Sequence, residues 1–92
     1  MKKKSLSDIF FKVGDGKASP LTQRGDWWSL LSKGKEIVII GKRWAVLSTE
    51  DFWPKQITDW NESKDQLMAL HDAIALCNIE YNTEIVLVNN QE

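Results

Sequence analysis

The chain contains one histidine and one cysteine, and these are the residues best suited to nucleophilic chemistry. His71 and Cys77 are six residues apart in a segment with helical apolar spacing. On a helix they would lie about 120° apart around the axis, which is poor geometry for a Cys-His pair. No Cys-x-x-Cys pair or second histidine supports a metal site. The sequence therefore predicts a protein that is not an enzyme and has no cofactor and no metal.

Charge is divided unevenly between the two halves of the chain. Residues 1–43 hold ten bases and four acids, a net +6, whereas residues 44–92 hold two bases and nine acids, a net −7. Such a division indicates either an anion-binding face or two halves that neutralise each other once folded. Both interpretations stay open at this point.

The length of 92 residues suits one small α+β domain. Residues 1–6 are expected to form a flexible basic tail, and the five tryptophans are expected to fill the core, with a ligand-lining set as the alternative. The chain has a single cysteine and no apolar run near the ~20 residues of a membrane helix. These features, and the lack of a secretory signal, predict a cytoplasmic protein.

Two segments of the N-terminal third have contrasting patterns. Residues 7–16 alternate apolar side chains and then reach two glycines, which predicts a strand. Residues 19–34 begin with Ser19 and Pro20 and end with Lys33 and Gly34, which predicts a helix. Gly25 disfavours a helix interior, so this helix could instead begin at Asp26.

Residues 35–48 predict a β-hairpin with a two-residue type II′ turn at Gly41-Lys42. Counting from the turn places Ile40 opposite Arg43 and Ile39 opposite Trp44. Directly opposed residues share a face, and both faces of the hairpin are then apolar.

The second half predicts a connection, a helix and a strand. Residues 49–62 have no clear period and are expected to carry a short helical turn. Residues 63–78 combine helical spacing with a capping box of Ser63 and Gln66, and Asn78 is expected to end the helix. Residues 83–90 again predict a strand.

This order, β-α-β-β-α-β, predicts a ferredoxin-like two-layer α/β sandwich with two helices on one face of a four-stranded antiparallel sheet. If the first segment is not a strand, the order is α-β-β-α-β. In both arrangements two short helices cover only one sheet face.

The uncovered sheet face is the basis of the first functional hypothesis. An exposed apolar patch of several hundred Å² usually marks an interaction site. The sequence therefore predicts a non-enzymatic protein-interaction module, a homodimer or the partner of another protein, similar in size to accessory proteins of phages and other mobile elements. Alternatively, the connection around Phe52, Trp53 and Trp60 covers the face within the chain. The predicted interaction residues are Val38, Ile40, Leu47, Val86 and Val88.

Binding of single-stranded nucleic acid is the alternative function. The element order and residues 42–49, KRWAVLST, resemble RNA recognition motifs, which place aromatic residues on an open sheet face. The chain departs from that pattern at Arg43, where the family has glycine, and at Val46 and Thr49, where it has aromatics. The residues that would bind nucleic acid are Lys33, Lys35, Lys42, Arg43 and Trp44.

Overall fold

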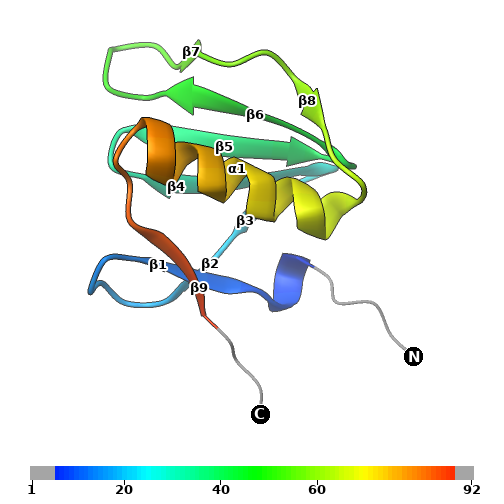
Figure 1. Cartoon of the computed structure of the whole chain (residues 1–92), viewed down its shortest axis with the longest axis horizontal. Helices are drawn as coiled ribbons and strands as arrows, with labels where there is room; N and C mark the ends of the chain where they lie inside the picture. Colours follow the sequence, from blue (N-terminus) through cyan, green and yellow to red (C-terminus); the bar gives the residue numbers. More distant parts are fainter. Residues whose placement is uncertain (1–5, 89–92) are drawn as a thin grey trace.

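The computed structural model describes residues 6–88, and within this range the fold is mostly β. It has one α-helix, one short 3-10 helix and nine strands in two sheets (Figure 1). The predicted ferredoxin-like sandwich with one four-stranded sheet and two helices is therefore wrong, and so is the α-β-β-α-β alternative. Residues 1–5 of the predicted basic tail lie outside the described residues, and Leu6 is buried in the core.

The larger sheet is an antiparallel meander of four strands connected by two-residue turns. These strands are β3 (Thr22–Arg24), β4 (Trp27–Ser32), β5 (Lys35–Ile40) and β6 (Arg43–Ser48). Two shorter strands, β7 (Lys55–Gln56) and β8 (Asn61–Glu62), pair with the free edge of β6. They replace the helical turn predicted for residues 49–62.

The hairpin of β5 and β6 confirms the predicted register. Ile40 pairs with Arg43 and Ile39 with Trp44. Gly41 has a φ of 61°, whereas Lys42 keeps a negative φ. This sign pattern belongs to the type II′ turn, whose twist matches that of the two strands.

The helix predicted for residues 19–34 is wrong. This segment instead forms β2 (Ser19–Pro20), β3 and β4. Two turns interrupt it, one at Gly25 with a φ of 63° and one at Lys33-Gly34 with φ values of 44° and 78°. Positive φ at both residues is the requirement of a type I′ hairpin turn, and it is incompatible with a continuing helix.

The smaller sheet brings the two ends of the described chain together. In it, β1 (Phe10–Val13) lies between β2 and β9 (Ile85–Val88), antiparallel to both. The strands predicted in residues 7–16 and 83–90 are thus confirmed. They belong to a different sheet from the hairpin, contrary to the prediction.

Helix α1 (Gln66–Glu80) confirms the helix predicted near residues 63–78, with different ends. Asp65, not Ser63, is the N-cap, and its carboxylate accepts a hydrogen bond of 2.9 Å from the Met68 amide. Ser63 instead accepts a bond from the Trp44 indole N–H and donates to Asp72. The helix continues past Asn78 to Glu80.

The main core lies between α1 and one face of the larger sheet, with the smaller sheet closing it at the side (Figure 1). The helix contributes a buried stripe of small and apolar residues that faces β5 and β6. The core residues from the sheet alternate along the strands, as one buried face requires. They are Trp28, Leu30, Ile37, Ile39, Trp44 and Val46.

Candidate protein-interaction surface

The face of the larger sheet that points away from α1 is called the outer face below. Because directly opposed residues share a face, the pairing of β4, β5 and β6 defines it in three rows. One end row is Trp27, Ile40 and Arg43, the middle row is Ser29, Val38 and Ala45, and the other end row is Leu31, Glu36 and Leu47.

The middle row is closed to solvent. Val38 and Ala45 are 0% exposed and Ser29 is 7% exposed. These residues lie outside the main core and are nevertheless closed to solvent. The centre of the outer face is therefore buried, and only its two ends reach solvent.

The end rows carry large apolar side chains that are partly exposed. Trp27 is 40% and Ile40 36% exposed at one end, and Leu31 is 58% exposed at the other. Trp60, from the loop before β8, is 42% exposed and stands next to the first of these ends. Ile40, Arg43 and Trp60 line an open pocket of about 120 Å³.

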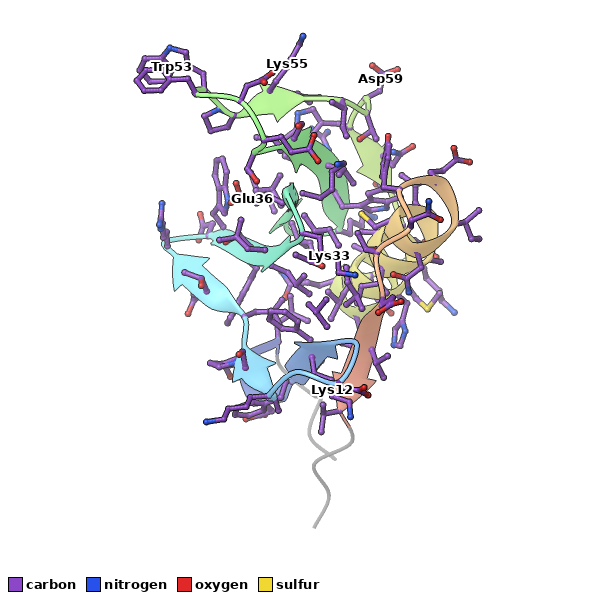
Figure 2. The ribbon with its side chains drawn as sticks, turned by 90° about the vertical axis from the view of Figure 1, so that its left-hand side faces the viewer. Lys12, Lys33, Glu36, Trp53, Lys55 and Asp59 are labelled. Carbon is purple, nitrogen blue, oxygen red and sulfur yellow. The ribbon has the colours of Figure 1, made fainter. Side chains whose placement is uncertain are left out.

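The loop between β6 and β7 carries an aromatic pair, Phe52 and Trp53, which we call the aromatic arm. The two side chains are 88% and 73% exposed, and their rings meet edge to face at 5.1 Å. Trp53 projects from the side of the sheet opposite α1 (Figure 2). Because both side chains are mostly exposed, the arm lies on the outer-face side without packing down onto the face.

The five predicted interaction residues do not form one surface. Ile40 and Leu47 lie on the outer face, as expected, but Val38 beside them is fully buried. Val86 and Val88 lie on β9 in the other sheet. Sequence reasoning missed Trp27, Leu31 and Trp60, and the first two would follow from β-alternation once residues 27–32 are recognised as a strand.

The lysines of the predicted nucleic-acid set form ion pairs with acids of the second half. Lys33 lies 3.7 Å from Glu84, Lys35 lies 3.2 Å from Glu50, and Lys42 lies 3.3 Å from Glu62. All three ion pairs of the described residues join a base of the first half to an acid of the second. They favour mutual neutralisation of the two halves over an anion-binding face.

Trp44, the aromatic residue of that set, is only 6% exposed. Its ring packs in the main core, and its Nε1 donates a 3.0 Å hydrogen bond to Ser63. A base cannot stack on a ring whose faces are buried. The resemblance to RNA recognition motifs therefore loses both its element order and its aromatic residue.

His71 and Cys77, the two residues suited to nucleophilic chemistry, do not form a site together. His71 is exposed, and Cys77 is fully buried against the sheet. Burial raises the pKa of the Cys77 thiol to about 11, although the nearby Lys35 ammonium acts in the opposite direction. A neutral buried thiol is unreactive. Residues 6–88 contain no cluster of three or more potential metal ligands.

This raised pKa predicts an alkaline loss of stability. Unfolded chains release the thiol proton near the ordinary pKa of 9.0, whereas the folded protein keeps it up to about 11. Between these pH values the unfolded state is favoured by up to about 1.4 kcal/mol per pH unit. We expect the free energy of unfolding, measured in urea from pH 8.5 to 11, to fall more steeply for the wild type than for Cys77→Ala. Parallel curves would contradict the assignment.

No helix within residues 6–88 is long and apolar enough to cross a membrane. The comparisons with known proteins return no match among family models, curated proteins or solved structures.

Proposed function

We propose that the chain is a protein-interaction module without enzymatic activity, and that its partner is a second copy of the same chain bound at the outer face. The observation that carries this proposal is that four large apolar side chains, Trp27, Leu31, Ile40 and Trp60, are 36–58% exposed at the two ends of the outer face. Large exposed apolar side chains gathered on one face are typical of interaction sites. The free thiol of Cys77 is compatible with the cytoplasmic location that the sequence predicts.

Charge favours a second copy over an unrelated partner. Arg43 and Glu36 lie at opposite ends of the outer face. Neither takes part in an ion pair within residues 6–88. A face that carries one free charge of each sign can complement itself, as symmetric dimers require.

Nucleic-acid binding has less support. Lys33 and Lys35 lie at one end of β5, whereas Lys42 and Arg43 lie at the other. Six residues of strand separate the two groups by about 20 Å. A binding titration with single-stranded oligonucleotides at several salt concentrations tests this alternative, because phosphate contacts give affinity that falls steeply with salt.

The proposal predicts that Leu31→Lys weakens self-association. Leu31 is the most exposed apolar residue of the outer-face strands, so the lysine is tolerated in the monomer but must be desolvated in the dimer. We expect the dimer Kd, measured by sedimentation over a wide concentration range, to rise about tenfold or more.

Ile79→Lys is the matched control. Ile79 is 76% exposed on α1, on the opposite side of the sheet from the outer face, and its substitution should leave the Kd unchanged. A wild-type protein that stays monomeric up to near-millimolar concentration would refute the proposed function. An equal effect of both substitutions would refute the assignment to the outer face.

A further inference from the structure

The outer face has an exposed aromatic pair at one end and an open pocket at the other. The aromatic arm directly precedes β7, whose Lys55 pairs with Ser48 at the last residue of β6. The pocket includes Arg43, the first residue of β6. Arm and pocket are therefore separated by the length of a six-residue strand, about 17 Å, and the arm of one copy does not fill its own pocket.

We propose that the aromatic arm of each copy docks into the Ile40–Arg43–Trp60 pocket of the other copy, in a symmetric dimer whose β6 strands run antiparallel across the interface. This inference rests on the proposed function, since it specifies how the second copy occupies the outer face. It assigns a role to Phe52 and Trp53, which no internal packing of the described chain explains.

When two copies stack outer face to outer face, the orientation of the two-fold axis decides whether arm meets pocket. An axis that lies between the two sheets and runs across the strands reverses the strand direction of the second copy and keeps the order of its strands. The arm end of each β6 then faces the pocket end of the other, and this happens twice because the contact is reciprocal. An axis parallel to the strands would place the pocket end of each copy against the pocket end of the other, so neither arm would reach a pocket.

The charges of the outer face select the same orientation. Glu36 lies at the arm end and Arg43 at the pocket end of the sheet. Reversal of the strands places the Glu36 end of each copy against the Arg43 end of the other, whereas the parallel axis would place the two Arg43 ends together. The guanidinium in the pocket is also suited to pack on the face of an incoming tryptophan ring.

The available apolar area suits a stable dimer. The arm, Trp27, Leu31, Ile40 and Trp60 are each between 36% and 88% exposed. At about 150–250 Å² for a large side chain, they expose on the order of 600 Å² together. Standard interfaces bury about 800 Å² per partner, including a polar rim. Without the arm, the outer face would supply little more than half of this exposed apolar area.

The test begins with Trp53→Ala in the full-length protein. Trp53 is 73% exposed in the monomer, so folding should be unaffected while the dimer Kd rises about thirtyfold, as for an interface tryptophan. Ile79→Ala, which removes an apolar side chain of α1, serves as the control with no effect. A dimer whose Kd is unchanged by Trp53→Ala would refute the exchange of arms but would leave association through the outer face standing. A monomeric wild type would refute both.

Charge reversal tests the orientation separately. Arg43→Glu and Glu36→Arg should each raise the Kd about tenfold, because each places like charges together twice in a homodimer. An equimolar mixture of the two variants should form a heterodimer close to wild-type affinity, since both contacts then pair opposite charges. The double variant should also regain affinity. Weakening of both single variants without rescue in the mixture or the double variant would contradict the antiparallel arrangement.

Discussion

Val38→Lys is expected to unfold the protein, whereas Ile40→Lys, two residues further along the same face of β5, is expected to leave it folded. Val38 is 0% exposed, and its direct neighbours across the sheet are the small residues Ser29 and Ala45. The outer-face rows hold one carboxylate, Glu36 in the next row, so an ammonium at position 38 has no partner across the sheet and must displace buried neighbours to reach Glu36 or solvent. This costs several kcal/mol, comparable with the whole stability of a small domain, about 5–15 kcal/mol.

Circular dichroism and urea titration distinguish the outcomes. Val38→Lys should lack a cooperative unfolding transition, and Ile40→Lys should keep one near that of the wild type because the 36% exposed position lets the ammonium reach water. Val38→Ala provides the milder control, with a loss of about 1–3 kcal/mol for a buried cavity. A folded Val38→Lys protein would mean that the centre of the outer face opens to solvent.

The sequence was most informative where structure is determined locally. The register of the β5–β6 hairpin follows from Gly41-Lys42 and from β-alternation on either side. Helix α1 follows from apolar spacing over about four turns. Only its ends differ from the prediction, because Asp65 and Ser63 are both good caps and local sequence cannot rank them.

Residues 19–34 were misread because the same residues can end a helix or turn a hairpin. Lys33-Gly34 is typical of a basic last helical turn followed by a C-terminal glycine. Its left-handed backbone serves a type I′ turn equally well. The contacts of β4 with β5 decide between the two structures, and they are tertiary: Trp28 pairs with Ile39 and Leu30 with Ile37.

The placement of the proposed interaction residues follows from the sequence only where it is determined locally. Alternation assigned Ile40 and Leu47 to the correct face of the hairpin. It could not reveal that β9 belongs to a separate sheet, because Val86 and Val88 find their partners on β1, more than 70 residues away in sequence. Trp60 was also out of reach, since its position depends on how the loop between β7 and β8 follows the edge of β6.

Asn78→Ala is expected to lower the free energy of unfolding by about 3 kcal/mol, because its side chain holds β9 onto α1. The Asn78 Oδ1 accepts hydrogen bonds from the Ile85 amide at 3.0 Å and from the Thr83 hydroxyl at 2.6 Å. Its Nδ2 donates to the Ile85 carbonyl at 3.0 Å. Thr83 and Ile85 are 4% and 3% exposed, so alanine would leave buried polar groups without partners.

Urea denaturation measures the loss, and amide exchange locates it. We expect β1 and β9 to lose protection first, because β9 connects the smaller sheet to α1 and Phe10–Val13 pairs along its whole length. Asn61→Ala is the matched control: Asn61 is exposed and donates one bond to Asp59, so its loss should cost less than about 0.5 kcal/mol. Equal effects of the two substitutions would mean that Asn78 does not hold the smaller sheet in place.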